Sequence, residues 1–258
     1  MRIARFSADD GVAFGVVDGD PGAETVVPIS GHPFGELQLA GPPRPLADVR
    51  LVAPVLPSKI VAVGRNYADH AAELGNEVPA EPLIFLKPST SIIGPYETIA
   101  YPTELSSRVD YEGELAVIIG RLCREVTVER APEVIFGYTC ANDVTARDLQ
   151  KSDPQWTRGK GFDTFCPLGP WVTTDLDTSD LELTTTLAGE VKQTGRTSQF
   201  IFGIPHLIAY ISQVMTLVPG DVILTGTPAG VGPMQVGDQV SVTIDGIGTL
   251  TNRVVARD

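Results

Sequence analysis

The sequence predicts a mostly β protein of the α+β class, with few helices. Short runs rich in β-branched and aromatic residues recur along the chain, for example at residues 59–63 and 83–88, and such runs are typical of buried strands. Helical patterns are confined to three short segments, at residues 67–74, 127–135 and 204–215. A chain of 258 residues, 43% of them hydrophobic, can bury a full core without disulfides.

A small β-rich unit is predicted at the start of the chain. Residues that favour strands, such as Phe6 and Phe14, lie at near-alternating positions on either side of a turn at residues 9–11, which predicts a hairpin. Prolines then crowd residues 42–57 and interrupt regular structure. We therefore predict a small β-rich N-terminal domain and a larger second domain, at residues 1–56 and 57–258.

The acidic segment 109–120 is the most informative stretch of the chain. A strand here places Asp110, Glu112 and Glu114 on one face, while residues 116–119 are apolar and indicate burial on both faces. Buried like charges need a cation, and a hard divalent ion with oxygen ligands is the usual solution. The alternative interpretation is a polar strand end at the protein surface.

A second polar segment, at residues 137–150, follows another β-type run and offers Asp143 as a third carboxylate. Two carboxylates from one strand and one from a neighbouring strand end would form half of a coordination shell for Mg²⁺ or Mn²⁺. Positions for water and substrate would remain open. In the same segment, Asp148 can be explained as a local ion pair with Arg147.

His70 and Glu73 are candidates for acid–base chemistry. They lie three residues apart in the predicted helix 67–74, which is expected to end at Gly75, so both side chains share one helix face. Such a pair can form an oriented acid–base dyad. Taken alone, the spacing favours a surface pair on a short helix.

Two lysines are candidates for charges inside a pocket. Lys87 ends the predicted strand 83–88 and is either a solvated strand terminus or a charge directed at a ligand. Lys160 stands between Gly159 and Gly161, and that flexible backbone could let the side chain reach a ligand.

The last third of the chain supplies packing elements and one glycine-rich loop. Within residues 221–233 a strand opens into this loop, whose backbone amides could cradle an oxyanion or a carboxylate, with Thr227 adding a hydroxyl. The helix at 204–215 is expected to face the core, with His206 in a structural role. Residues 239–255 are expected to close the chain as a hairpin.

The composition argues against several classes of function. A net charge of −13 disfavours a general nucleic-acid or anionic-membrane surface. The three cysteines are widely spaced, which suggests neither a disulfide framework nor a structural zinc site. With no apolar leader and no apolar run of membrane-spanning length in the sequence, we expect a cytoplasmic protein.

Taken together, five polar segments resemble those of the fumarylacetoacetate hydrolase family, over roughly residues 58–258. They are Gly64 to His70, Phe85 to Pro88, Asp110 to Leu115, Asn142 to Gln150, and Leu224 to Pro228. The resemblance implies a catalytic domain built on a rolled sheet and a homodimer. It also implies an Mg²⁺ or Mn²⁺ ion held by Glu112, Glu114 and Asp143.

The same resemblance implies roles for other residues at the site. His70 and Glu73 would form a dyad that activates water or moves protons, and Lys160 would lie over a developing enolate. The implied substrate contacts are Gln150 and Thr227, with Arg65 and Lys87 as further candidates. In such enzymes the metal would chelate a small anionic 2-oxo acid and stabilise its enolate.

One departure points to the smaller branch of the family. Fumarylacetoacetases proper are expected to bring a further aspartate ligand from before the histidine, and residues 61–67 offer no carboxylate. The resemblance therefore implies an isomerase acting on 2-hydroxyhepta-2,4-diene-1,7-dioate or a carbon–carbon bond hydrolase, in the catabolism of small or aromatic acids. The alternative is an oxaloacetate decarboxylase, and a remote alternative is a non-catalytic binding scaffold stabilised by a metal.

Overall fold

The computed structural model describes residues 1–9, 11–73 and 77–257, and the described chain is mostly β, as predicted. Its largest sheet is 13-stranded, with strand order β4-β3-β2-β1-β15-β13-β12-β18-β7-β8 and side branches at β5, β6 and β9. The strands of this sheet are β1 (Arg2–Ala8), β2 (Gly11–Asp18), β3 (Thr25–Ser30), β4 (Gln38–Leu39), β5 (Arg44–Pro45), β6 (Arg50–Val52), β7 (Ile60–Gly64), β8 (Leu83–Lys87), β9 (Ile92–Ile93), β12 (Gly113–Ile119), β13 (Ile135–Asn142), β15 (Cys166–Thr173) and β18 (Val222–Leu224).

Two smaller sheets complete the β structure of the described residues. A 5-stranded sheet contains β10 (Thr98–Tyr101), β21 (Gly248–Ala256), β20 (Gln239–Ile244), β16 (Glu182–Leu187) and β17 (Glu190–Arg196) in that order. A 3-stranded sheet contains β14 (Thr145–Ala146), β11 (Val109–Tyr111) and β19 (Gly232–Pro233). The pairing of β20 with β21 confirms the predicted C-terminal hairpin.

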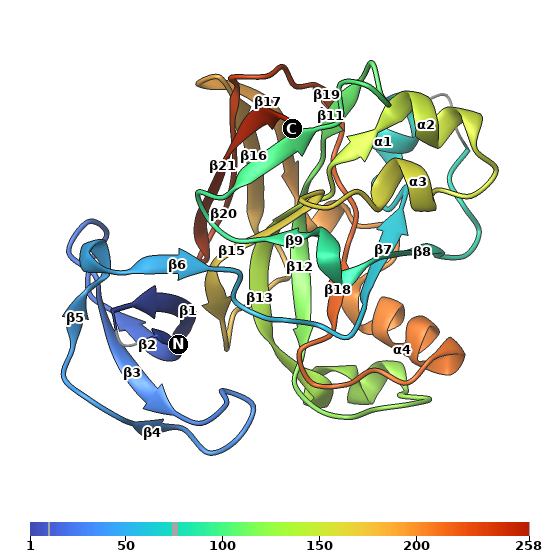
Figure 1. Cartoon of the computed structure of the whole chain (residues 1–258). Helices are drawn as coiled ribbons and strands as arrows, with labels where there is room; N and C mark the ends of the chain where they lie inside the picture. Colours follow the sequence, from blue (N-terminus) through green and yellow to red (C-terminus); the bar gives the residue numbers. More distant parts are fainter. Residues whose placement is uncertain (10, 74–76, 258) are drawn as a thin grey trace.

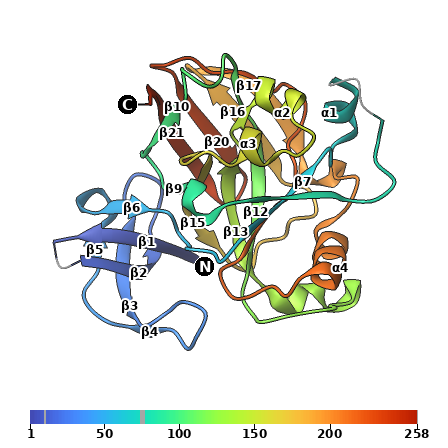
Figure 2. The same ribbon diagram turned by 45° about the vertical axis from the view of Figure 1, so that its right-hand side comes forward.

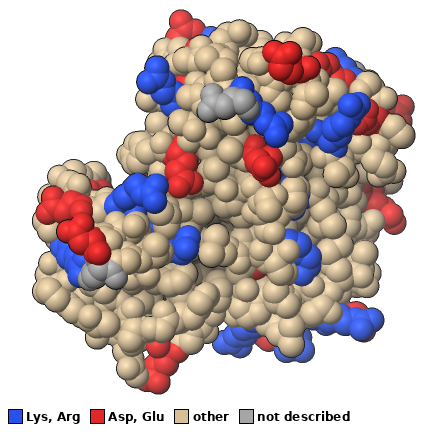
Figure 3. Space-filling model, in the orientation of Figure 1, with Lys and Arg blue, Asp and Glu red and all other residues tan. Residues whose placement is uncertain are grey.

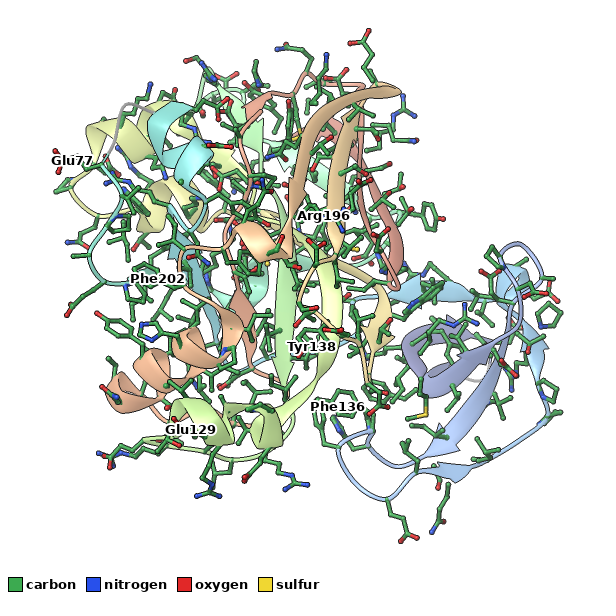
Figure 4. The ribbon with its side chains drawn as sticks, turned by 180° about the vertical axis from the view of Figure 1, so that it is seen from behind. Glu77, Glu129, Phe136, Tyr138, Arg196 and Phe202 are labelled. Atoms are coloured by element: carbon green, nitrogen blue, oxygen red, sulfur yellow. The ribbon has the colours of Figure 1, made fainter. Side chains whose placement is uncertain are left out.

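The N-terminal strands form a β unit beside the rest of the molecule (Figure 1). The predicted hairpin is confirmed by the pairing of β1 with β2, although Asp10 in its turn lies outside the described residues. At the junction, β1 pairs with β15, and the ring of Phe34 packs edge-on against that of Phe136 of β13, with the ring centroids 4.7 Å apart. Figure 4 shows Phe136 on the side of β13 that faces the N-terminal unit. The predicted boundary near residue 56 falls in the irregular stretch between β6 and β7.

The centre of the large sheet is buried on both faces, which explains the apolar run at residues 115–119. Leu115, Val117 and Ile119 point to one face of β12, into a core shared with the helix α4 (Ile204–Val214) and the 5-stranded sheet. Ala116 and Ile118 point to the other face, into a second core. Because side chains alternate along a strand, Glu114 lies on the face of Ala116 and Ile118.

The helices occupy two ends of the molecule. Figures 1 and 2 show α1 (Ala68–Glu73), α2 (Arg147–Ser152) and α3 (Thr157–Lys160) together near one end, and α4 near the other. The short 3₁₀ helices are η1 (Leu46–Asp48), η2 (Ser89–Ser91), η3 (Val128–Val134) and η4 (Thr197–Gln199). The segment predicted to be helical at 127–135 is η3, and the side chain of Thr127 makes no capping hydrogen bond. The expected helix end at Gly75 lies outside the described residues.

The prediction of one continuous strand over residues 109–120 is wrong. The strand breaks at Glu112, where β11 ends and β12 begins, and these two strands belong to different sheets. Asp110 therefore does not join the carboxylates of β12. It is fully buried and paired with Arg108 and Arg147 instead.

Cys123, Cys140 and Cys166 are all buried and free of disulfides. In the described part of the chain, no helix is long and apolar enough to cross a membrane. Figure 3 shows acidic and basic side chains interspersed over the face of Figure 1.

Candidate active site

Three carboxylates converge where β12 and β13 lie side by side. Glu112 and Glu114 flank the start of β12, and Asp143 directly follows β13, which pairs with β12 through Gly113 and Asn142. Ligand oxygens of the three side chains all lie within 4.8 Å of one another. The side chains are nearly completely buried, so their charges interact in a medium of low polarity.

The backbone around Glu112 is fixed by close packing. The backbone N–H of Asp143 donates to the carbonyl of Glu112 at 2.8 Å, and the N–H of Glu112 donates to Oδ1 of Asn142 at 2.9 Å. A Cβ atom at Gly113 would lie 2.0 Å from Oγ1 of Thr185, so only glycine fits between the two carboxylates of β12.

Two buried lysines form ion pairs with Glu112 and Asp143. Nζ of Lys160 lies 2.7 Å from Oε2 of Glu112 and 2.5 Å from Oδ2 of Asp143, and Lys87 binds the other Asp143 oxygen at 2.5 Å. Burial by itself would raise the pKa of Glu112, but Lys160 and Arg147 hold that pKa well below its usual range. Burial likewise opposes the charge of Lys160, yet Asp143 and Glu112 raise its pKa.

Glu114 differs from its neighbours because, within the described residues, no cationic side chain forms an ion pair with it. Among the described residues, the only hydrogen bond to its carboxylate comes from the backbone N–H of Gly226, at 2.7 Å from Oε2. Burial, together with the charges of Asp143 and Glu112, raises the pKa of Glu114 well above its usual range. A divalent cation fits this position because it would offset the unpaired charge, and its preferred ligands are carboxylate oxygens.

Arg147 is a buried residue whose guanidinium binds several side chains of the site, and the sequence interpretation did not identify it as a site residue. Its guanidinium binds Asp110 at 2.9 Å, Glu112 at 2.5 Å and Oε1 of Gln150 at 2.6 Å. The suggested ion pair between Arg147 and Asp148 is wrong. Asp148 instead accepts hydrogen bonds from Ser106 and Ser107. The available sequence signal was an arginine four residues after Asp143, in a segment rich in small and polar residues.

His70 and Glu73 lie together on α1, on the same cavity as the carboxylates. Nδ1 of His70 is 3.4 Å from Oε2 of Glu73, and the Glu73 carboxylate accepts the backbone N–H of Gly230 at 3.0 and 3.2 Å. His70 is 5% exposed, and its burial lowers the pKa of the imidazole in spite of the neighbouring Glu112. The buried imidazole is therefore neutral near pH 7 and able to accept a proton.

The glycine-rich loop after β18 binds carboxylates, but they are the chain's own. The backbone N–H groups of Gly226 and Gly230 donate to Glu114 and Glu73, and both glycines have φ of +97°, a conformation that disfavours other residues. Thr227 lies between them. Its hydroxyl donates to the carbonyl of Gly113 at 2.8 Å.

These side chains line one cavity of about 370 Å³. Phe85 and Trp156 form an apolar part of its wall, with ring centroids 5.2 Å apart, and Nζ of Lys160 lies 5.1 Å from the centroid of Phe85. All but one of the predicted site residues lie on the cavity wall: Arg65, His70, Glu73, Glu112, Glu114, Asp143, Gln150, Lys160 and Thr227. The exception is Lys87, which is 1% exposed and lies behind Asp143.

Comparison with protein families identifies both parts of the chain. The model for the fumarylacetoacetate (FAA) hydrolase C-terminal domain matches residues 59–255, and an Rv2993c-like N-terminal model matches residues 1–54. The chain belongs to the fumarylacetoacetate hydrolase family. It resembles the smaller branch, because the relatives described next carry names from that branch.

Three relatives illustrate this placement. Protein Rv2993c of Mycobacterium tuberculosis is 57% identical over 263 residues, covering 100% of this chain and 99% of that protein. The mitochondrial oxaloacetate decarboxylase of Dictyostelium discoideum is 48% identical and covers 74% of this chain and 90% of its own length. The oxaloacetate tautomerase YisK of Bacillus subtilis is 43% identical, and the match covers 81% of this chain and 74% of YisK.

Two solved structures share the whole fold. The 2-hydroxyhepta-2,4-diene-1,7-dioate isomerase from Mycobacterium marinum has a TM-score of 0.93 and 55% identity, covering 99% of this chain and 98% of that one. Maleylpyruvate hydrolase from Sphingobium sp. SYK-6, in complex with manganese(II) and pyruvate, has a TM-score of 0.82 and 34% identity, covering 100% of both chains. The chain is thus an enzyme of this family, and its acidic triad fits a divalent metal.

Proposed function

We propose that this enzyme moves a proton at C3 of small 2-oxo acids, in an isomerase or tautomerase reaction, with Mg²⁺ or Mn²⁺ on Glu112, Glu114 and Asp143. The observation that carries the proposal is the combination in one cavity of an unpaired buried carboxylate, a buried ammonium and a neutral imidazole. When bound, the metal would supply Lewis-acid stabilisation of negative charge on a keto oxygen.

Lys160 is suited to meet the charge that develops when C3 loses a proton. Its ammonium is buried from bulk solvent, is held by Glu112 and Asp143, and faces the cavity. It therefore needs little reorganisation during the reaction. The glycine on either side allows the close backbone packing that fixes it. A Cβ at Gly159 would lie 2.9 Å from the backbone of Gln150, and one at Gly161 would lie 2.5 Å from the carbonyl of Thr157.

His70 is the base that the cavity offers for the C3 proton. Its Nδ1 faces Glu73, so the tautomer that donates from Nδ1 leaves Nε2 free to accept a proton. Glu73 is itself held by the backbone N–H of Gly230, which restricts the orientation of the imidazole. The names of the relatives support proton transfer of this kind, because they include an isomerase and an oxaloacetate tautomerase.

The same dyad favours a second candidate function, hydrolysis of a carbon–carbon bond in an acylpyruvate. Hydrolysis needs a water made nucleophilic by a positioned base, and His70 oriented by Glu73 could provide it. Decarboxylation of oxaloacetate is a third candidate that needs no such base, since a metal held by Glu112, Glu114 and Asp143 would supply Lewis-acid stabilisation for the enolate that remains when CO₂ leaves.

Variants of the dyad test this division of roles. His70→Ala and Glu73→Ala should each abolish acylpyruvate hydrolysis, weaken isomerisation and largely spare oxaloacetate decarboxylation, for whichever of these activities the parent enzyme shows. Steady-state assays on the three substrates, with and without a chelator, provide the measurement. Equal loss of decarboxylation in both variants would exclude a selective role for the dyad.

A further inference from the structure

Asp110 is a buried carboxylate that the proposed reaction does not use. It lies on β11, is fully buried and does not line the cavity. Its Oδ2 accepts a hydrogen bond from Nε of Arg147 at 2.9 Å, and Arg108 donates to its two oxygens at 2.9 and 3.2 Å. Because Arg108 is exposed, Asp110 links a cation at the protein surface to a cation on the cavity wall.

The contacts of Arg147 explain what Asp110 can do. A guanidinium is planar, so its three nitrogens move as one rigid group. Nε donates to Asp110, while Nη2 donates to Oε1 of Glu112 at 2.5 Å and Nη1 donates to Oε1 of Gln150 at 2.6 Å. Fixing Nε against Asp110 therefore also fixes the two nitrogens that hold a carboxylate of the acidic triad and the amide of a wall residue.

The backbone keeps Asp110 and Arg147 beside each other. Asp110 pairs with Thr145 of β14 in the 3-stranded sheet, and Arg147 begins α2 directly after that strand. The backbone N–H of Arg147 donates to the carbonyl of Arg108 at 2.8 Å. The position of Asp110 relative to the guanidinium is thus set by the pairing of these two strands.

Glu112 depends on side-chain partners for its orientation. It lies between the end of β11 and the start of β12, where the strand breaks. Arg147 binds its Oε1 and Lys160 binds its Oε2, so a cation holds each of its oxygens. A shift of the Arg147 guanidinium would therefore turn the carboxylate of Glu112 away from the position that it shares with Glu114 and Asp143.

From these contacts we infer that Asp110 is a positioning residue of the metal site: by orienting Arg147, it sets the orientation of the Glu112 carboxylate toward the ion. The inference rests on the proposed function, in which Glu112 is one of three ligands. Groups that bind a ligand side chain orient it, and their loss typically weakens metal binding by about 10- to 100-fold. Asp110 acts one step farther out, through the guanidinium, so we expect the lower end of that range.

Calorimetry with Mn²⁺ on full-length variants tests the inference. Asp110→Ala should weaken Mn²⁺ binding about tenfold, because Nε of Arg147 loses its acceptor. Asp110→Asn should weaken it less than about threefold, since the amide oxygen can still accept from Nε and Arg108 already offsets most of the lost charge. Equal weakening in the two variants would mean that the charge of Asp110 acts, not its hydrogen bond, and would overturn the inference.

A double-mutant cycle with Arg147→Met tests whether Asp110 acts through Arg147. In the Arg147→Met background, Asp110→Ala should change the affinity for Mn²⁺ less than about twofold. The double variant lacks both members of the pair and so leaves no unpaired charge between them. This arm of the test therefore does not depend on the folding of Asp110→Ala alone. A tenfold loss in that background would show that Asp110 acts by another route.

Asp221→Ala is the matched control. Asp221 is also fully buried and binds Lys59 and Ser58, but it does not line the cavity. Urea unfolding should show lower stability in both alanine variants, whereas only Asp110→Ala should bind Mn²⁺ more weakly. Unchanged affinity in Asp110→Ala, or equal weakening in the control, would overturn the inference while the proposed function stands. A parent enzyme that binds no Mn²⁺ would overturn the proposed function and the inference with it.

Discussion

The inner and outer ends of the active-site cavity hold charges in opposite ways. At the inner end, Glu112, Asp143 and Lys160 are almost completely buried and bound to one another. At the outer end, Arg65 and Lys151 are more exposed and have no partner among the described residues. When a buried charge loses its partner, no water can solvate it in the partner's place, whereas an exposed charge is readily solvated. Changes at the inner end should therefore affect folding, metal binding and catalysis, and changes at the outer end should leave folding and metal binding largely unchanged.

Glu112, just before β12, and Glu114, within it, offer the strongest test of the inner end, because their environments are opposite. Glu112→Gln removes one of the two carboxylate partners of both Lys160 and Arg147, so the metal-free variant should lose on the order of 3 kcal/mol of unfolding free energy at pH 7. Glu114→Gln removes a buried charge without an ion pair, so the metal-free variant should instead be more stable than the parent. Both variants should bind Mn²⁺ far more weakly than the parent does.

The pH dependence of stability separates these two effects. Because the pKa of Glu114 is raised in the folded state, ionisation of Glu114 destabilises the folded parent. This destabilisation is absent below about pH 4.5 and grows as the pH rises through the folded-state pKa. The extra unfolding free energy of the Glu114→Gln variant over the parent should therefore vanish in acid. The lowered pKa of Glu112 gives stability that is present above about pH 4.5 and lost in stronger acid. Urea unfolding with a chelator measures both, and stability changes of the same sign at pH 7 would contradict the contrast.

Lys160→Met tests catalysis at the inner end. Turnover should fall about a hundredfold or more, because the charge that develops on the substrate loses a preorganised cation. Affinity for Mn²⁺ should not weaken, since the ammonium no longer competes for oxygens of Glu112 and Asp143. Calorimetry with Mn²⁺ and single-turnover kinetics give the two readouts, and an unchanged rate would remove Lys160 from the reaction.

The smallest expected effect concerns the pH profile set by His70. Burial lowers its pKa below the ordinary value of about 6.5, and the base must be neutral to act. The value of kcat/KM should therefore stay level as the pH falls from about 8 to 6.5, and decline only below that. Because Glu73 raises the pKa of His70, Glu73→Gln should move the decline to still lower pH. A decline that begins above pH 7 would argue against His70 as the base.

Local periodicity was sufficient to predict much of this site. Residues three apart on a helix are neighbours, so the sequence alone placed His70 beside Glu73. Glu112 and Glu114 also meet as predicted, although Glu112 lies at the break before β12 and not within one continuous strand. The same reasoning identified the strands of the core, the C-terminal hairpin and α4. These features depend on bonds and side-chain directions within one element or between adjacent ones.

Only the tertiary structure decided which charges meet across the fold. It paired Arg147 with Asp110 and Glu112 rather than with its neighbour Asp148, and it put Lys87 behind Asp143. It also broke the acidic strand at Glu112, because the residues before and after that position pair with strands of two different sheets. Partners such as Arg147 and Glu112 are 35 residues apart in the chain. Sequence spacing says nothing about such pairs, because their geometry is set by how the sheets pack.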